Sequence, residues 1–189
     1  MTPPEPEPAS AFVLRHRALL DATTPLGPVA ELACGRGRNA LELARGGRTV
    51  IGIDRSASAL RDLTERAARA ALPVQAVRAD LESGAEIPLR PASCGAVVVT
   101  RYLHRSLSDA LAALLAPGGL LLYETFTRDQ EKLGYGPRNP AFLLEVGELP
   151  RLFPRLTVVA AEEGLFEDGR PHALARLLAR RPSQGSRSS

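Results

Sequence analysis

Residues 29–40, with the sequence VAELACGRGRNA, decide the fold of this chain. A short apolar run that contains one acidic residue leads into a turn of small residues with Gly35 and Gly37, and a helix-like pattern follows. Glycine lets the backbone approach a ligand closely and adopt angles that other residues avoid. A second apolar run at residues 49–53 ends in Asp54. This order predicts a site for a nucleotide-type cofactor at the carboxyl edge of a parallel sheet, with Asp54 on the ribose hydroxyls.

Apolar runs and helical patterns alternate along the rest of the chain. We predict strands at residues 29–33, 49–53, 74–77, 96–99, 120–124, 156–161 and 173–178. We predict helices at residues 10–20, 38–45, 56–70, 107–115 and 145–153. The Asp168-Gly169 pair between the last two strands is typical of a hairpin. The alternation predicts an α/β fold, Rossmann-like and doubly wound, with a mostly parallel sheet and right-handed crossovers.

The composition is that of one globular domain. The chain has 189 residues, of which 44% are hydrophobic and 24% charged, enough for one α/β domain with a full core. We expect a single domain at residues 10–180 between disordered tails at 1–9 and 181–189. There is no apolar run of 18 residues, so no transmembrane helix is expected. Residues 1–8 lack the basic and apolar regions of a signal peptide, and a cytoplasmic protein is the simplest interpretation.

Charge and cysteine content give no indication of nucleic-acid binding, a disulfide framework or a metal site. The net charge is +3, and Lys132 is the only lysine among 24 basic residues. The arginines are scattered along the chain, so charge alone does not imply binding to nucleic acid. Cys34 and Cys94 form neither a disulfide framework nor a metal-binding spacing, and no metal is expected.

Residues 31–39, ELACGRGRN, resemble the first motif of the class I S-adenosylmethionine-dependent methyltransferases. The Cys-Gly-x-Gly-Arg-Asn form resembles the small bacterial branch that includes tellurite-resistance methyltransferases. The resemblance covers roughly residues 10–180. It implies a seven-stranded sheet with a C-terminal antiparallel hairpin, S-adenosylmethionine as cofactor and methyl transfer as activity. Many relatives begin the fourth strand with an acidic residue, where Gly95 stands here.

The resemblance assigns cofactor contacts to three strand ends. Glu31 would lie near the methionine ammonium, and Asp54 would bind the ribose beside Arg55, which could cover the adenine face. Asp80 would accept from the adenine amino group, and Leu81 would offer its backbone amide. Without a ligand, these acidic residues would be a surface carboxylate, a helix cap and a loop aspartate. The expected cofactor-binding residues are Glu31, Ala33, Cys34, Gly35, Gly37, Asn39, Asp54, Arg55, Asp80, Leu81 and Arg101.

The fourth strand end holds a tyrosine, a histidine and two arginines within residues 101–105. Arg101 or Arg105 could hold an anionic acceptor by a forked contact. His104 could act as a general base, or it could be a packing histidine at a helix start. The candidate catalytic residues are therefore His104, Arg101, Arg105 and Tyr102.

Residues 125–142 resemble a lid of the tellurite-resistance-like branch. A loop of this length at the carboxyl edge of a sheet is more often functional than idle, although it could be a plain surface loop. The aromatic residues expected to wall off an acceptor are Phe126, Tyr135 and Phe142. The cations expected to attract an anion are Arg128, Lys132 and Arg138.

Several functions stay open at this level. The chain lacks the Asn/Asp-Pro-Pro-Tyr arrangement of amino-group methylases, which favours a small-molecule acceptor such as an oxyanion, a thiol or a chalcogen species. The first alternative is an RNA or protein methyltransferase, although nucleic acid is not favoured by the scattered charge. A non-catalytic cofactor-binding regulator is the second. The third is an NAD-dependent oxidoreductase, whose fingerprint sometimes allows an alanine such as Ala40 at its third glycine position.

Overall fold

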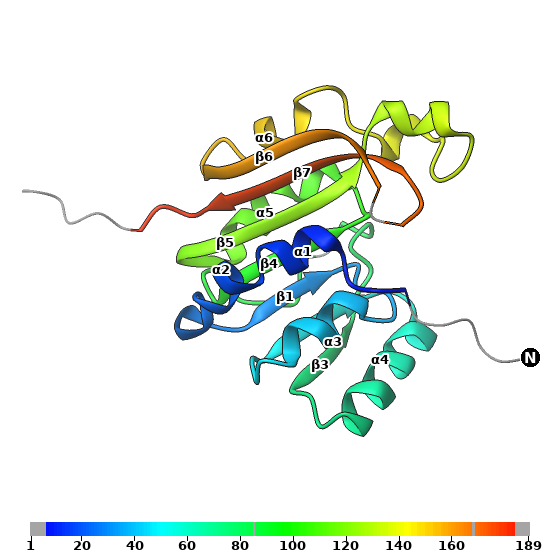
Figure 1. The fold of residues 1–189 in the computed structure, drawn as a ribbon. Coiled ribbons are helices and arrows are strands. Elements are labelled where there is room, and N and C mark those ends of the chain that lie inside the picture. Colours follow the sequence, from blue (N-terminus) through cyan, green and yellow to red (C-terminus); the bar gives the residue numbers. More distant parts are fainter. Residues whose placement is uncertain (1–6, 85, 168, 184–189) are drawn as a thin grey trace, which may run out of the picture.

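Seven strands form one mixed sheet in the computed structural model, which describes residues 7–84, 86–167 and 169–183. The strand order is β3-β2-β1-β4-β5-β7-β6 (Figure 1). The strands are β1 Val29–Leu32, β2 Val50–Asp54, β3 Val74–Arg78, β4 Cys94–Thr100, β5 Leu115–Phe126, β6 Thr157–Phe166 and β7 His172–Arg180. Strands β1 to β5 pair in parallel, whereas β7 is antiparallel to both β5 and β6. The expected Rossmann-like, mostly parallel sheet with a C-terminal antiparallel hairpin is confirmed.

Helices cover both faces of the sheet. The α-helices are α1 Ala11–Arg15, α2 Arg17–Asp21, α3 Arg38–Ala44, α4 Ala57–Arg69, α5 Ser108–Leu114 and α6 Glu148–Arg151. Short 3-10 helices are η1 Thr24–Leu26, η2 Arg105–Leu107, η3 Arg128–Leu133 and η4 Pro140–Phe142. Buried side chains of α1 to α4 pack on one face of the sheet, and those of α5 and α6 pack on the other.

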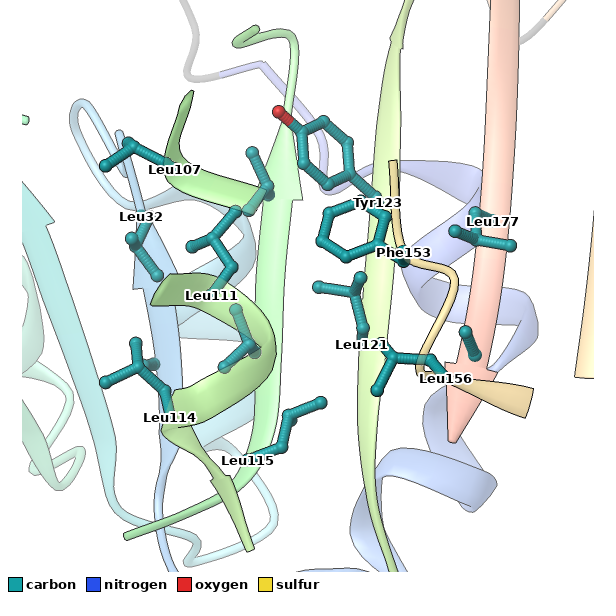
Figure 2. Close-up of a cluster of buried hydrophobic side chains, with 14 of the residues drawn as sticks. Leu32, Leu107, Leu111, Leu114, Leu115, Leu121, Tyr123, Phe153, Leu156 and Leu177 are labelled. Carbon is teal, nitrogen blue, oxygen red and sulfur yellow. The ribbon is translucent and has the colours of Figure 1, made fainter. Parts of the chain in front are cut away.

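The central strand β4 shows why the apolar runs become buried strands. Successive side chains of a strand point to opposite faces, so Val97 and Val99 join the core under α5, while Ala96 and Val98 join the core under α1 to α4. Figure 2 shows the first of these cores. The labelled side chains that meet there are Leu32, Leu107, Leu111, Leu114, Leu115, Leu121, Tyr123, Phe153, Leu156 and Leu177.

The strand order reverses between β1 and β4, which lie side by side at the centre of the sheet. Ala33 follows β1 with φ 52°, and Arg101 follows β4 with φ 54°. Residues with a side chain rarely adopt the left-handed region, and such residues cluster at functional sites. The loops on both sides of the switch point therefore hold unusual backbone conformations where an α/β sheet binds its ligands.

The structure corrects several predicted boundaries. The predicted helix at 10–20 is two helices, because the chain bends at His16, which has φ −102°. The last two strands are longer than predicted, since they pair as far as Phe166 and His172. The predicted Asp168-Gly169 hairpin signal lies partly outside the described residues, because Asp168 is not among them.

The predicted tails also need correction where the structure describes them. Residues 1–6 and 184–189 lie outside the described residues. Arg181 continues the sheet, because its backbone N–H donates to Gly119 O at 2.9 Å and its carbonyl accepts from Gly118 N–H at 2.9 Å. Glu7 contacts Arg101, so the described ends of both predicted tails belong to the folded domain.

Candidate functional site

Three adjoining cavities lie at the carboxyl edge of the sheet. The β2 cavity, of about 200 Å³, is lined by Asp54, Arg55, Asp80, Leu81, Tyr102 and their neighbours. The β1 cavity, of about 340 Å³, is lined by Glu31, Cys34, Gly35, Arg36, Thr100 and others. The large cavity, of about 780 Å³, is lined among others by Glu124, Phe126, Tyr135, Phe166, His172 and Arg176. Ala33 lines both smaller cavities, and Glu7, Arg38 and Arg101 line both the β1 and the large cavity. The three cavities therefore adjoin one another at these shared residues.

The two glycines after β1 serve different purposes. Both have positive φ, 53° at Gly35 and 71° at Gly37. A Cβ on Gly35 would meet nothing within 4 Å, so its backbone is open toward the β1 cavity. A Cβ on Gly37 would lie 2.3 Å from Leu63 Cδ1 on α4. Gly35 therefore exposes backbone to a ligand, whereas Gly37 permits the turn and the close packing of α4.

Asp54 is held rigidly at the β2 cavity. Its Oδ2 accepts from the Gly35 N–H and its Oδ1 from the Ser56 N–H, both at 2.8 Å. Each carboxylate oxygen keeps a second lone pair for a ligand. Asp80, which accepts from the Glu82 N–H at 3.0 Å, lies in the same cavity. The structure therefore brings together the four residues expected around the ribose and adenine, Asp54, Arg55, Asp80 and Leu81.

Tyr102 belongs to this β2 cavity, although the sequence suggested a catalytic role. It lies with Asp54 and Asp80 and is absent from the lining of the large cavity. Its hydroxyl is buried and has no hydrogen-bond partner among the described residues. Burial raises the pKa of Tyr102 to about 12, so the phenol keeps its proton and can donate to a ligand.

Glu31 is a buried carboxylate at the β1 cavity, with 1% of its surface exposed. Its Oε1 accepts from Asn39 Nδ2 at 2.8 Å, and its Oε2 has no partner among the described residues. Burial raises the pKa of Glu31 to about 7, although the Asn39 hydrogen bond opposes the shift. An uncompensated buried carboxylate that faces a cavity fits a cationic ligand group.

Asn39 positions this carboxylate from behind the cavity wall. The Asn39 side chain is fully buried and lines none of the three cavities, contrary to the cofactor contact expected for it. Its Nδ2 also donates to Thr100 Oγ1 at 2.9 Å, and its Oδ1 accepts from the Ser10 N–H at 2.8 Å. These hydrogen bonds join β1, the end of β4 and the N-terminal segment to one another.

The same network continues along one face of the sheet to β5 and β7. Ser10 Oγ donates to Glu124 Oε1 at 2.9 Å, and Arg176 Nε donates to Glu124 Oε2 at 2.6 Å. The Glu124 and Arg176 side chains are only 4% and 2% exposed. The sequence analysis missed this pair. The available signal was a charged residue within each of two largely apolar strands, at positions that pair across β5 and β7.

The loop after β4 divides the predicted catalytic residues. Arg101 lines the β1 and the large cavity, as expected for a residue near an acceptor. His104 lines none of the three cavities, and its Nε2 lies 2.9 Å from Ser106 Oγ at the start of η2. Arg105 donates to Glu148 at 2.5 Å and to the carbonyls of Ala141 and Leu143. Arg105 is therefore an anchor for the segment that follows β5, and His104 is a residue of the helix start.

The predicted lid packs beside β7, close to the turn between β6 and β7 (Figure 1). Gln130 holds it there, because its Oε1 accepts from the Ala173 N–H at 3.0 Å. Phe126 and Tyr135 line the large cavity, but Phe142 is 47% exposed and does not. The three predicted anion-attracting cations line none of the three cavities and contact neighbours instead, namely Arg128 with Glu145, Lys132 with Asp129 and Arg138 with Gly134 O.

His172, which the sequence analysis did not select, lies in the wall of the large cavity. Its ring makes edge contacts with Phe126 and Tyr135, with centroids 5.6 and 5.8 Å away. Its Nδ1 is buried and has no hydrogen-bond partner among the described residues. Burial, with the charges of Arg101 and Arg170, lowers the pKa of His172, so the neutral imidazole is favoured.

The comparisons agree with this arrangement. Residues 29–119, which include β1 to β4 and the loops of both smaller cavities, match the family model described as a methyltransferase domain. Over these residues the chain is therefore similar to a methyltransferase domain. An uncharacterized methyltransferase of Mycobacterium tuberculosis is 38% identical over 120 residues, which cover 60% of this chain and 58% of that relative.

Several solved structures share the fold. TehB from Haemophilus influenzae has a TM-score of 0.68 at 22% identity, over 88% of this chain and 62% of that one. N-methyltransferase NodS from Bradyrhizobium japonicum has a TM-score of 0.65 at 17% identity, over 93% and 99% of the two chains. Within the described residues, no helix has the length and apolar character needed to span a membrane.

Proposed function

We propose that the chain transfers a methyl group from S-adenosylmethionine to a small-molecule acceptor bound in the large cavity. The observation that carries the proposal is that the three cavities adjoin one another. The β2 and β1 cavities meet at Ala33, and the β1 and large cavities meet at Arg38 and Arg101. A donor that filled the two smaller cavities would reach the boundary of the large cavity, where an acceptor could meet it.

The residues of the smaller cavities fit the cofactor. The unpartnered Glu31 Oε2 suits an ammonium group, and the fixed carboxylate of Asp54 suits a pair of ribose hydroxyls. Asp80, the Leu81 backbone and the Tyr102 hydroxyl line the adenine end. When bound, the cofactor supplies an electrophilic methyl group, so the protein needs mainly to orient two ligands and exclude water.

The large cavity supports a small-molecule acceptor. Its volume of about 780 Å³ is within the usual range for small-ligand sites. Phe126, Tyr135 and Phe166 give it aromatic walls, and His172 offers one neutral polar group. An oxyanion, a thiol or another soft acceptor needs no strong base, which agrees with a site where His104 lies outside the three cavities and His172 has a lowered pKa.

Calorimetric titration with S-adenosylhomocysteine tests the cofactor part of the proposal. We expect micromolar binding, and we expect Asp54→Ala to weaken it about 100-fold, because a carboxylate acceptor of two hydrogen bonds is lost. Asp109→Ala, an exposed aspartate on α5, is the matched control and should leave binding unchanged. Binding of NAD with no binding of S-adenosylhomocysteine would contradict the proposal.

Turnover separates an enzyme from a non-catalytic cofactor-binding protein. A panel of small oxyanions, thiols and carboxylates is incubated with S-adenosylmethionine, and the formation of S-adenosylhomocysteine is measured. We expect turnover with at least one small molecule and none with bulk RNA or protein. Methylation confined to RNA or protein would overturn the acceptor class, while leaving the cofactor assignment intact.

A further inference from the structure

The N-terminal segment reaches the boundary between the β1 and the large cavity. It enters α1 from the carboxyl edge of the sheet (Figure 1). Glu7 Oε2 accepts from Arg101 NH1 at 2.8 Å and lies 3.5 Å from Arg38 NH1. The Pro8 carbonyl accepts from the same Arg38 nitrogen at 3.2 Å. One carboxylate of this chain thus bridges two guanidinium groups at the point where the cavities meet.

The two arginines come from opposite sides of the switch point. Arg38 begins α3 after the glycine turn, and Arg101 follows β4 in a left-handed conformation. Burial and the nearby charge of Arg101 both lower the pKa of Arg38, while Glu7 opposes that shift. Two like charges held this close favour a bound anion, and a forked guanidinium matches a carboxylate well.

The rest of the β1 cavity complements the opposite charge. Glu31 lines this cavity with Arg38 and Arg101, and its buried Oε2 has no partner among the described residues. One unpartnered carboxylate beside two guanidiniums suits a ligand that carries an ammonium and a carboxylate. Glu7 supplies the carboxylate half of such a ligand from within the chain.

We propose that Arg38 and Arg101 form a carboxylate-binding subsite, which Glu7 occupies in the free chain and leaves when a ligand carboxylate binds. The proposal rests on the proposed function for the identity of its ligands. The incoming carboxylate has two possible sources, because the pair borders both cavities. It belongs either to the amino-acid end of the cofactor or to an acceptor in the large cavity.

Release of Glu7 requires only a local movement. Ser10 stays fixed by its hydrogen bonds to Asn39 and Glu124, both among buried groups. The Glu7 side chain is 65% exposed, and a salt bridge of that exposure contributes little net stability. Glu7 therefore acts as an internal competitor that a ligand carboxylate displaces.

The test compares Glu7→Gln with the unaltered chain in three titrations. The ligands are S-adenosylhomocysteine, 5′-methylthioadenosine, which is a related nucleoside thioether without the amino-acid end, and benzoate. If the cofactor is the source, Glu7→Gln tightens S-adenosylhomocysteine binding about twofold to fivefold and leaves methylthioadenosine unchanged. If an acceptor is the source, Glu7→Gln tightens benzoate binding to the S-adenosylhomocysteine-loaded protein by a similar factor. Glu65→Gln, an exposed glutamate on α4, is the matched control.

Substitution of either arginine should weaken, rather than tighten, the binding of the ligand carboxylate. Arg38→Gln and Arg101→Gln should each weaken the carboxylate ligand about tenfold without affecting methylthioadenosine. The proposal is overturned if Glu7→Gln changes the affinity of neither S-adenosylhomocysteine nor benzoate. Its failure is distinct from that of the proposed function, which fails if neither nucleoside binds. Benzoate binding to the free protein still tests the subsite in that case.

Discussion

The β2 cavity and the large cavity are built in different ways. The β2 cavity gathers its residues from the ends of strands β2 and β3 and from the loop after β4, where parallel topology alone brings them together. The large cavity gathers residues from the N-terminal segment, β5, the segment after β5 and the β6–β7 hairpin. A buried hydrogen-bond chain through Ser10, Glu124 and Arg176 joins several of these parts. Topology thus positions the β2 cavity, and specific buried side chains position the large cavity.

The largest effect should come from breaking that buried chain. Glu124→Leu removes the nearest carboxylate from Arg176 and leaves Glu162, 3.4 Å away, as its acidic partner. Loss of one member of a buried pair typically costs about 3–5 kcal/mol of unfolding free energy. Urea unfolding measures this loss. The double variant Glu124→Leu/Arg176→Leu should recover most of it, and a single-variant cost below about 1 kcal/mol would refute the role of the pair.

The next largest effect concerns Glu31. Glu31→Gln should change the free energy of unfolding by nearly as much as the loss of the buried pair, but only at high pH and in the stabilising direction. Burial raises the pKa of Glu31 from 4.5 to about 7, so the folded chain holds the proton more tightly than the unfolded chain. Ionisation therefore lowers stability as pH rises from 4.5 to 7, by about 3 kcal/mol in all.

We expect the Glu31→Gln chain to be more stable than the unaltered chain at pH 8 and equally stable at pH 4. Urea unfolding at both pH values gives the comparison, with the exposed Glu65→Gln as control. The same variant should bind S-adenosylhomocysteine more weakly, because the neutral amide cannot pair with an ammonium. A stability difference that does not depend on pH would be inconsistent with a raised pKa.

Arg105→Gln should separate anchoring from ligand binding. Arg105 ties the loop after β4 to Glu148 and to two backbone carbonyls, and its side chain is 37% exposed. We expect a loss of about 1 kcal/mol in stability and unchanged affinity for S-adenosylhomocysteine. Arg101→Gln should show the reverse pattern. A large loss of affinity in Arg105→Gln would return Arg105 to the list of ligand-binding residues.

The smallest effect concerns His172. Burial, with the charges of Arg101 and Arg170, lowers the pKa of His172 below 6.5. Since the folded chain favours the neutral ring, stability is lost as pH falls below 6.5. Titration of the ring protons by NMR should give a midpoint below that of a free histidine, and Arg101→Gln should raise it. A midpoint at or above 6.5 in the unaltered chain would exclude the buried, neutral state.

The sequence predicted those parts of the molecule that depend on local pattern. Continuous apolar runs predicted the strands, and the glycine turn with Asp54 predicted a cofactor site where the β1 and β2 cavities lie. The sequence could not predict which way the loop after β4 runs, because that depends on the left-handed backbone of Arg101. The loop runs toward β3, so that Tyr102 lies with Asp80 in the β2 cavity.

The acceptor end was harder to predict, because its residues are distant in sequence. Glu124 and Arg176 are 52 residues apart and meet only through the pairing of β5 with β7. Asn39 was placed in the correct motif, but its role behind the cavity wall depends on Ser10 and Thr100, which no local pattern connects with it.

Ala33 lies where the two smaller cavities adjoin. It is the residue common to their walls, and it has a left-handed backbone that disfavours β-branched side chains. A ligand that fills both cavities would therefore pass only the methyl side chain of Ala33. We expect a longer side chain at this position to obstruct a ligand that extends from one cavity into the other, while each cavity could still hold a shorter ligand.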